Sequence, residues 1–313
     1  MNKREPRVSI GLPVFNGENY LEEALDSILA QTYSDFELII SDNASTDQTP
    51  EICRAYAARD PRIHCYRNAQ NLGAAKNFNR VFELSSGEYF KWAAHDDLIA
   101  PDFLLKCVQV LDQDPTVVLC HSKVKFIDES GEVSANYDIK LCNVDSPKPQ
   151  DRFGDLIMMH HWCFDVFGLI RAKALKMTPL IASYIESDRA LLVELGLLGR
   201  FYELPEHLFF SREHKERSVR ALPERHLRAG WFDPTKEGHI VLPRWRIFLE
   251  YSKSVRRVSP SRYERAWCYI HLVNWLRLYG KGLVKDLLVA AYQIWHRFFT
   301  PERKNQRMPQ KAS

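Results

Sequence analysis

Two adjacent aspartates, Asp96 and Asp97, are the residues of this sequence with the clearest chemical potential. They follow the apolar segment EYFKWAA and precede a helix predicted to begin at Pro101. Carboxylate oxygens at a strand end suit a hard divalent cation, which can bridge the phosphates of a nucleotide. An isolated acidic pair is more often a solvated helix start, where aspartate is favoured. The residues around the pair therefore decide between these interpretations.

Polar groups also follow other predicted elements. Asp42 comes after the buried run FELIIS, where it can accept hydrogen bonds from a base or ribose, although a simple turn aspartate gives the same pattern. Asn71-Leu72-Gly73 and Lys76 lie at a predicted helix start, which suits either an anion or plain capping. No GxGxxG follows the first strand and GxxxxGK[ST] does not occur, which disfavours dinucleotide-binding and P-loop sites.

Apolar runs alternate with segments of helical periodicity along the first 120 residues. The predicted strands are 8–15, 36–41, 63–66, 88–93 and 117–120, and the predicted helices are 21–29, 49–59, 74–84 and 101–111. This alternation is typical of a mainly parallel α/β sheet with right-handed crossovers. Ligands of such sheets bind beyond the carboxyl ends of the strands, so the polar clusters are expected to form one site there.

Composition narrows the class of protein. The 313 residues are 45% hydrophobic and 27% charged, as in ordinary globular proteins. No run of about 18 apolar residues predicts a membrane-spanning helix, and no secretion signal is expected at the amino terminus. Seven scattered cysteines without a CxxC pair predict reduced thiols in a cytoplasmic protein. His160-His161-Trp162 lacks a further ligand at helical spacing, so no zinc site is expected there.

Charge is distributed unevenly along the chain. Residues 1–210 contain 21 Lys and Arg against 31 Asp and Glu, whereas residues 211–313 contain 22 against 9. Basic helices with aromatic residues over 244–299 suit an anionic membrane surface. Packing against the sheet or against a second subunit explains the same composition, so both interpretations stay open. No nucleic-acid-reading motif accompanies the basic residues, and no nucleic-acid partner is expected.

The segment VSIGLPVFNGENYLEEALDSILAQTYSDFELIISDNASTDQT resembles the amino-terminal signature of family 2 glycosyltransferases. NLGAAKNFN and the Asp96-Asp97 pair follow in the family's order and spacing, so the resemblance covers residues 7–127. It implies a GT-A fold, in which a sheet that binds a nucleotide-diphospho-sugar precedes an acceptor-binding part. It also implies inverting sugar transfer, usually with Mn²⁺ or Mg²⁺ as cofactor.

The resemblance assigns roles to individual positions. Asp42 matches the aspartate that contacts the base, and Asp97 matches the direct metal ligand, with Asp96 beside it. The residues matched to the nucleotide-sugar pocket are Pro13, Phe15, Glu18, Asp42, Lys76 and Asp96. The family's DDGS is here Asp42-Asn43-Ala44-Ser45, and its acidic residue before the metal pair is His95. These departures leave open which nucleotide base the donor carries.

Inverting transfer needs a general base that deprotonates the acceptor hydroxyl. YIESDR before the apolar run ALLVELGLL resembles the family's acidic element, which implies Asp188 as the base and Glu186 as the second candidate. FFSREHKERSVR resembles the following segment, which closes over the diphosphate. It implies that Arg212 contacts phosphate and that His214 is a third metal ligand, although a lone histidine is more often structural.

The expected architecture is α/β: a GT-A domain over 1–220, divided into a nucleotide-sugar part (7–127) and an acceptor part (128–220), then a basic helical region (221–300) and a disordered tail (301–313). The expected partners are a nucleotide-diphospho-sugar and a glycan or lipid-linked acceptor. Cell-surface polysaccharide or glycolipid assembly in the cytoplasm, at the inner face of the plasma membrane, is the expected setting. The alternatives are a nucleotidyl-transferring enzyme on the same sheet and a non-catalytic scaffold. The sequence leaves open the sugar, the nucleotide base, the acceptor and homo-oligomerisation.

Overall fold

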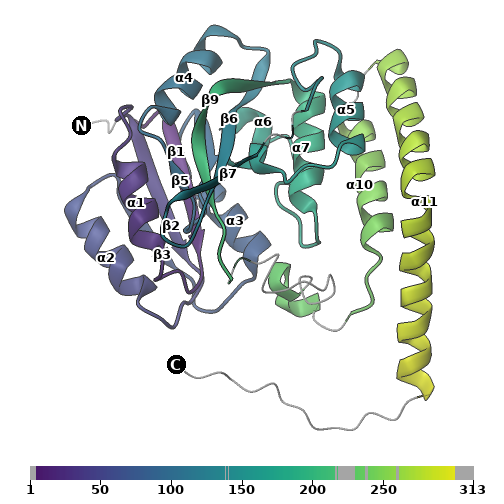
Figure 1. Ribbon diagram of the computed structural model, residues 1–313, viewed down its shortest axis with the longest axis horizontal. Coiled ribbons are helices and arrows are strands. Elements are labelled where there is room, and N and C mark those ends of the chain that lie inside the picture. Colours follow the sequence, from purple (N-terminus) through teal and green to yellow (C-terminus); the bar gives the residue numbers. More distant parts are fainter. Residues whose placement is uncertain are drawn as a thin grey trace.

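The structure, a computed structural model, describes residues 5–137, 139, 141–215, 217, 230–236, 239–258 and 261–299. A central sheet carries helices on both faces, and a long carboxy-terminal helix runs along one side of the molecule (Figure 1). The α/β fold predicted from the sequence is confirmed.

The alternation predicted for the amino-terminal half is present in the structure. Its elements are β1 (Val8–Val14), α1 (Leu21–Leu29), β2 (Phe36–Asp42), α2 (Thr49–Arg59), β3 (Ile63–Arg67), α3 (Ala74–Glu83), β4 (Tyr89–Trp92), β5 (Leu98–Ile99) and α4 (Phe103–Gln113). β1 is buried along its whole length, because helices cover both faces of the sheet at this position. This explains why the strand is a continuous apolar run without polar alternation.

The second half contains the two longest strands, β6 and β9, and the longest helix, α11. Its elements are β6 (Val117–Ile127), β7 (Val133–Tyr137), α5 (Pro149–Met158), the 3-10 helix η1 (Phe164–Phe167), β8 (Leu169–Arg171), α6 (Ala172–Leu175), α7 (Ser187–Leu198), β9 (Arg200–Arg212), the 3-10 helix η2 (Pro234–Lys236), α10 (Pro243–Val258) and α11 (Arg262–Phe299). β6 extends past the predicted end at Cys120 and pairs with β7 as a hairpin.

The strand order is β3-β2-β1-β4-β8-β6-β9-β5, with β7 paired to β6. The strands β3, β2, β1 and β4 are parallel, and β6 is parallel to β9. β8, β7 and β5 run antiparallel to their neighbours, so the second half of the sheet is mixed. The pairing of Leu98 with Phe210 brings the end of β9 beside the segment that follows Asp96 and Asp97.

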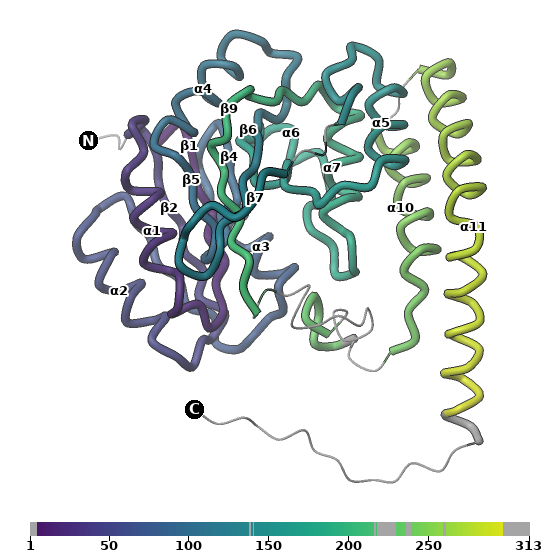
Figure 2. Tube along the Cα trace, viewed as in Figure 1, coloured from purple at the N-terminus to yellow at the C-terminus, as the bar shows by residue number. Residues whose placement is uncertain are grey.

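Two apolar cores hold the helices on the sheet. One core contains the inner faces of α1, α2 and α4. The other joins α3, α5 and α7 to the inner faces of α10 and α11, which run beside one another (Figure 2). A β-carbon at Gly154 of α5 would collide with the ring of His271, so this glycine allows α5 and α11 to approach closely.

The predicted carboxy-terminal helical region is confirmed as α10 and α11. α10 is joined to α7 by polar contacts as well as by apolar packing. Glu194 of α7 forms an ion pair with Arg257 at 2.6 Å and accepts a hydrogen bond from the Ser254 hydroxyl at 2.9 Å. None of the helices in the described part of the chain has the length and apolarity that crossing a membrane requires. The predicted tail over 301–313 lies outside the described residues.

Candidate active site

The loops after β1 and β2 meet the aspartate pair at one edge of the sheet. The backbone N–H of Asn16 donates to the Ser45 hydroxyl, and that of Gly17 donates to the Thr49 hydroxyl, both at 2.9 Å. Gly17 lies so close to His95 that a β-carbon there would collide with the imidazole ring. The strand ends predicted to form one site therefore lie together.

β9 places Arg212 against the carboxylate pair. The backbone N–H of Arg212 donates to Oδ1 of Asp97 at 2.9 Å, and its Nε donates to the backbone carbonyl of Asp96 at 3.1 Å. The antiparallel pairing of β5 with β9 sets this alignment. Both aspartates are thus held by one residue, which lies 115 positions after Asp97 in the sequence.

The Arg212 side chain is fully buried. Its other nitrogens donate to the backbone carbonyls of Asp128 and Glu129, both at 3.2 Å, and form an ion pair with Glu23 at 2.6 Å. A buried arginine is stable only when its donors are paired in this way. In this arrangement Arg212 holds both aspartates in place, and its expected contact with phosphate stays a prediction.

His214 lies beside the same pair. Its Nε2 is 2.8 Å from Oδ2 of Asp96, and its ring packs on Tyr20 with centroids 4.9 Å apart. Within the described ranges, no group of three His, Cys, Asp or Glu side chains is arranged to hold a metal ion. Mg²⁺ is commonly bound by one or two carboxylates, with substrate phosphates and water as the other ligands. The two aspartates therefore fit a cation whose coordination the substrate completes.

Burial and charge separate the pKa values of the two aspartates. For Asp97, burial and the neighbouring charge of Asp96 raise the pKa to about 7. For Asp96, burial also acts to raise the pKa, but His95 and the hydrogen bond with His214 outweigh it and lower the pKa to about 2. Without a cation, Asp97 therefore keeps its proton to a higher pH than an ordinary carboxyl does, and a cation that binds there must displace that proton.

Asp42 is the buried acid at the end of β2, with 4% of its surface exposed. Its Oδ1 accepts the backbone N–H of Ser45 at 2.8 Å, and its Oδ2 forms an ion pair with Arg67 at 2.9 Å. Asp42 pairs with Val14 across β1 and β2, one residue before Phe15, whose ring is 42% exposed. The fixed carboxylate at the end of β2 therefore lies beside the end of β1, where exposed Phe15 follows.

The other residues matched to the nucleotide pocket lie in three different positions. Pro13 is buried within β1. Glu18 is exposed, and its carboxylate accepts the backbone N–H of Gln48 at 2.7 Å, which ties the loop after β1 to the start of α2. Lys76 is exposed in the first turn of α3.

A buried asparagine network, not predicted from the sequence, positions the loop before α3. Asn43 Oδ1 accepts the backbone N–H of Leu72 and the amide of Asn68, both at 2.9 Å. Asn77 Oδ1 accepts from the amide of Asn68 at 3.0 Å and from the hydroxyl of Ser41 at 2.7 Å. Which of these amides pair with one another depends on how the fold brings their segments together, so the sequence alone does not reveal the network. The network links the end of β2 to the first turn of α3.

Asp188 and Glu186 lie at the start of α7. Glu186 precedes the helix in a left-handed conformation with φ of 66°, and Asp188 is in the first turn. Oδ1 of Asp188 accepts the backbone N–H of Arg189 at 2.8 Å. Burial raises the pKa of Asp188. This effect outweighs the lowering of the pKa by that hydrogen bond and by the Arg189 charge. A raised pKa is what a carboxylate base needs to accept a proton near neutral pH.

Two arginines connect α7 and β9 to the segment 159–164. Arg189 donates to the backbone carbonyls of Met159 at 3.1 Å and His161 at 2.5 Å. The Arg217 guanidinium lies 5.1 Å from the centre of the Trp162 ring, and its charge acts on the pKa of Asp97. Arg217 is thus near both the aspartate pair and the segment that contacts α7.

Backbone strain is concentrated around these segments. Five described residues other than glycine have positive φ, and four of them flank the regions above: Asn16, Ala44, Cys163 and Glu186. Such conformations cost on the order of 1–3 kcal/mol each and recur at functional sites. Asn16 and Ala44 follow β1 and β2, whereas Cys163 and Glu186 belong to the two segments that Arg189 joins.

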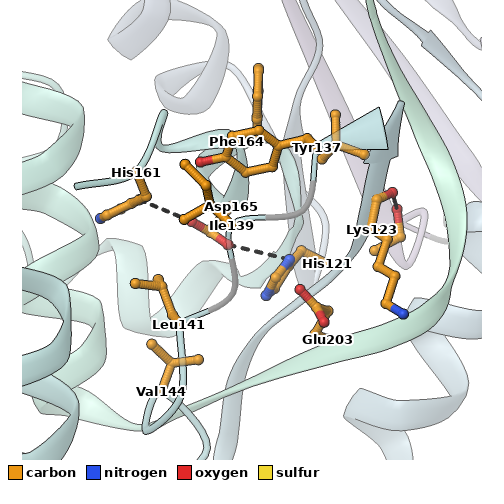
Figure 3. A pocket seen from close by; sticks show the side chains of 12 residues that line it. His121, Lys123, Tyr137, Ile139, Leu141, Val144, His161, Phe164, Asp165 and Glu203 are labelled. Carbon is orange, nitrogen blue, oxygen red and sulfur yellow. Dashed lines mark hydrogen bonds and ion pairs between the residues drawn. The ribbon is translucent and has the colours of Figure 1, made fainter. Parts of the chain in front are cut away.

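A small pocket lies over β6 and β9, and the sequence did not predict it. Asp165 lies between two histidines of this pocket, with Oδ1 3.3 Å from Nδ1 of His121 and Oδ2 3.6 Å from Nδ1 of His161 (Figure 3). His160, by contrast, is exposed. His121 and Asp165 are 44 positions apart, so no local pattern reveals their pairing.

Known proteins resemble this chain in sequence over its first half. The sequence profile described as glycosyl transferase family 2 matches residues 9–175. An uncharacterised glycosyltransferase of Rickettsia typhi is 38% identical over 122 residues, which cover 38% of this chain and 37% of that protein. An uncharacterised glycosyltransferase of Methanocaldococcus jannaschii is 33% identical over 131 residues, 41% of this chain and 45% of that protein. The matched region is thus less than half of each relative.

Solved structures share the fold over most of the chain. S. aureus TarS (residues 1–349), in complex with UDP-GlcNAc, matches 87% of this chain and 72% of its own, with a TM-score of 0.59 and 17% identity. The mannosyltransferase PcManGT from Pyrobaculum calidifontis, in complex with GDP-Man and Mn²⁺, matches 96% and 89%, with a TM-score of 0.50 and 18% identity. Because the family profile covers more than half of the sequence, the chain belongs to glycosyl transferase family 2.

Proposed function

We propose that this chain transfers a glycosyl group from a nucleotide-diphospho-sugar to an acceptor hydroxyl, with inversion at the anomeric carbon. The observation that carries the proposal is the Asp96–Asp97 pair, held by Arg212 and His214 where the strand ends meet. Family membership supports the activity, and the relatives' structures support the fold. The inner face of the plasma membrane, in cell-surface polysaccharide or glycolipid assembly, is the proposed setting.

The aspartates and the candidate base divide the chemistry between them. Asp97 and Asp96 would hold Mn²⁺ or Mg²⁺ together with the donor phosphates, and the bound cation supplies positive charge that stabilises the leaving diphosphate. Asp188 accepts the proton of the acceptor hydroxyl, which attacks the anomeric carbon from the face opposite the leaving group. Glu186, two residues earlier, is the second candidate for this proton transfer.

The nucleotide lies along the ends of β1 and β2 in this proposal. Asp42 accepts hydrogen bonds from the base, and the exposed ring of Phe15 stacks on it. Pro13 and Glu18 shape the loop after β1, and Lys76 supplies positive charge on the phosphate side. Relatives with the same fold bind UDP-GlcNAc or GDP-Man, so uridine and guanosine nucleotides are the first to test.

Thermal unfolding with UDP, GDP, dTDP and CDP tests the donor site. We expect one nucleotide to raise the melting temperature with Mn²⁺ and to lose this effect with a chelator. Ligand at about 100 times its Kd adds about 2.7 kcal/mol of stability, which corresponds to several degrees. Stabilisation that is the same with Mn²⁺ and with chelator would contradict the role of the aspartate pair.

We further propose that α11 lies on an anionic membrane surface, where it brings the site to a lipid-linked acceptor. Its buried face packs on the rest of the protein through Cys268, Leu272, Trp275 and Leu283. Thirteen large apolar side chains of α11 are nonetheless exposed: Tyr263, Trp267, Tyr269, Ile270, Val273, Leu278, Val284, Leu287, Leu288, Val289, Tyr292, Ile294 and Trp295. Apolar exposure on this scale marks an interaction surface.

The charges of α11 favour anionic lipid over a second copy of the chain. At helical spacing, Arg277 and Lys281 lie between Val273 and Val284 on the side opposite the buried face. The acidic residues of α11 are Glu264, in its first turn, and Asp286, which is buried and paired with Arg244. Two copies that met through this outward face would bring like charges together, whereas lipid phosphates complement them.

Sedimentation with vesicles tests this surface. We expect the full chain to bind vesicles that contain phosphatidylglycerol and to bind pure phosphatidylcholine weakly. Arg277→Glu with Lys281→Glu should reduce binding about tenfold or more, since each basic residue contributes about 1 kcal/mol. Arg54→Glu with Arg59→Glu on α2 makes the same charge change on exposed residues elsewhere and serves as the control. Equal loss in both variants, or self-association that the α11 changes abolish, would contradict the membrane assignment.

A further inference from the structure

Two cysteines, Cys53 of α2 and Cys65 of β3, lie against one another at the edge of the sheet. The Cys65 thiol donates to the backbone carbonyl of Cys53 at 3.2 Å, although the residues are twelve positions apart. Side chains alternate along a strand, so Ile63 lies on the same face of β3 as Cys65. Ile63 packs in the apolar core that also contains Cys53. Both sulfurs therefore lie between α2 and β3.

The two thiols differ in their access to solvent. Cys53 is 3% exposed, because α2 packs this side chain into the core. Cys65 is exposed, and β3 is the terminal strand of the sheet in the described part of the chain. A thiol reagent from solution therefore reaches Cys65 and does not reach Cys53 directly.

Contact between the two thiols also gives them different acidities. The hydrogen bond with Cys53 lowers the pKa of Cys65, and it outweighs burial and the charge of Asp42, which both act to raise that pKa. For Cys53, the contact with Cys65 and burial raise the pKa. The thiolate is the nucleophile in thiol–disulfide exchange. Cys65 is therefore suited to attack a disulfide, and Cys53 is suited to complete the exchange.

A second pair of cysteines offers a comparison within the same chain. The thiol of Cys107 in α4 donates to the backbone carbonyl of Cys120 in β6 at 3.6 Å. Both residues are completely buried, so no reagent reaches them in the folded protein. All seven cysteines lie among the described residues, and none of them is in a disulfide. Of the two pairs, only Cys53 and Cys65 combine contact with an exposed sulfur.

We propose that Cys53 and Cys65 form a reversible disulfide by exchange with a small-molecule disulfide, such as oxidised glutathione. The Cys65 thiolate attacks one sulfur of glutathione disulfide, which forms a mixed disulfide and releases one glutathione thiolate. The Cys53 sulfur loses its proton, attacks the Cys65 sulfur and releases the second glutathione. Two protein thiols are thereby oxidised to one disulfide, and glutathione disulfide is reduced to two molecules of glutathione. Excess reduced glutathione reverses both steps.

This modification site lies near the ion pair at the end of β2. Arg67, two residues after Cys65, pairs with Asp42 at 2.9 Å. The helix α2 begins at Thr49, whose hydroxyl accepts the backbone N–H of Gly17. The disulfide thus joins two elements that contact the ends of β1 and β2. It does not depend on glycosyl transfer, since it requires only the two thiols and an oxidant.

Peptide mapping after redox equilibration tests the site. The full chain is equilibrated with glutathione buffers, quenched with acid, unfolded and treated with N-ethylmaleimide, which blocks every remaining thiol. Trypsin cleaves after Arg54, Arg59 and Arg62, so the two cysteines are on different peptides unless a disulfide joins them. We expect this cross-linked pair of peptides to increase with the proportion of oxidised glutathione. Dithiothreitol should abolish it, and Cys107 and Cys120 should be recovered as blocked thiols.

Serine variants test the order of the two steps. Cys53→Ser lacks the second thiol, so the exchange should stop at the mixed disulfide, with glutathione retained on Cys65. Cys65→Ser should carry no glutathione on Cys53, which is buried. Each variant should lose the cross-link completely. Cys142→Ser, which removes an exposed cysteine elsewhere, is the matched control and should give the same cross-linked fraction as the wild type.

Three results would overturn the proposal. In the first, both cysteines are recovered as blocked thiols in excess oxidised glutathione. In the second, the wild type retains glutathione on Cys65, which would mean that the Cys53 sulfur does not reach it. In the third, Cys107 and Cys120 are cross-linked to the same extent, which would remove exposure as the deciding property. None of these results bears on sugar transfer by the reduced protein, so the two proposals fail separately.

Discussion

Asp97→Asn is expected to lower kcat/KM for the nucleotide-sugar about 10³-fold, a loss of several kcal/mol of transition-state stabilisation by the cation. Asparagine retains an oxygen that accepts the Arg212 N–H, so the local structure is preserved while the charge is lost. Initial rates measured over a Mn²⁺ titration check this result. The wild type should saturate with Mn²⁺, and the variant should show no Mn²⁺-dependent rise.

The matched control for this variant is Asp102→Asn. Asp102 is exposed just before α4 and accepts a hydrogen bond from the Thr32 hydroxyl at 2.9 Å. The substitution makes the same chemical change five residues away from Asp97, so it should leave the rate unchanged. Full Mn²⁺-dependent activity in Asp97→Asn would remove the aspartate pair from the mechanism.

The raised pKa of Asp97, about 7, also predicts how the stability of the protein and its affinity for Mn²⁺ depend on pH. Its folded-state pKa lies above the ordinary carboxyl value, so the native state binds more protons than the unfolded state between about pH 4 and 7. The contribution of Asp97 to the stability of the cation-free protein therefore falls as pH rises through that range. The affinity for Mn²⁺ changes in the opposite direction and weakens as pH falls below about 7, because the cation must replace the proton.

Asp188→Asn is expected to lower kcat by about 10²–10⁴-fold, the usual contribution of a general base, with little change in nucleotide binding. The amide cannot accept the acceptor's proton, yet it keeps an oxygen for the Arg189 N–H. Steady-state kinetics and the nucleotide-dependent melting shift together check both parts of the result. Because burial raises the pKa of Asp188, the wild-type kcat should decline on acidification at a higher pH than an ordinary carboxyl would cause.

Two further variants complete the Asp188 experiment. Asp155→Asn lies on the neighbouring helix α5, where the carboxylate accepts the backbone N–H of Asn143, and it should leave kcat unchanged. Glu186→Gln tests the second candidate for the base. Unimpaired kcat in Asp188→Asn, combined with a large loss in Glu186→Gln, would transfer the role of base to Glu186.

The amino-terminal half of the fold was predictable because local patterns determine it. β1, β2 and β4 are buried on both faces, so they appear as continuous apolar runs followed by polar residues. The parallel arrangement places those residues at one edge, which is why Asp42 and the Asp96–Asp97 pair were expected to share a site.

The second half of the sheet was not predictable in the same way. β5 and β8 have two and three residues, too few for a periodic signal. Both strands are defined by antiparallel pairing with β9, β4 and β6, which only the assembled sheet supplies.

Long-range pairing also explains which site assignments the sequence could not make. Arg212 pairs with Glu23, 189 positions earlier, and no local pattern reveals that contact. The pairing of His121 with Asp165 depends on η1 packing against β6. The residue types were visible in the sequence, whereas their partners were set by strand order.

The most direct test of glycosyl transfer is the product released from a nucleotide-sugar by the wild-type chain. UDP-GlcNAc and GDP-Man, each supplied with Mn²⁺ and a mixture of glycan and polyprenyl-phosphate-linked acceptors, provide the first substrates. Glycosyl transfer predicts release of the nucleoside diphosphate, in an amount equal to the sugar recovered on the acceptor. Release of pyrophosphate would contradict the account. So would a donor that binds at the Asp96–Asp97 pair with Mn²⁺ and is never cleaved.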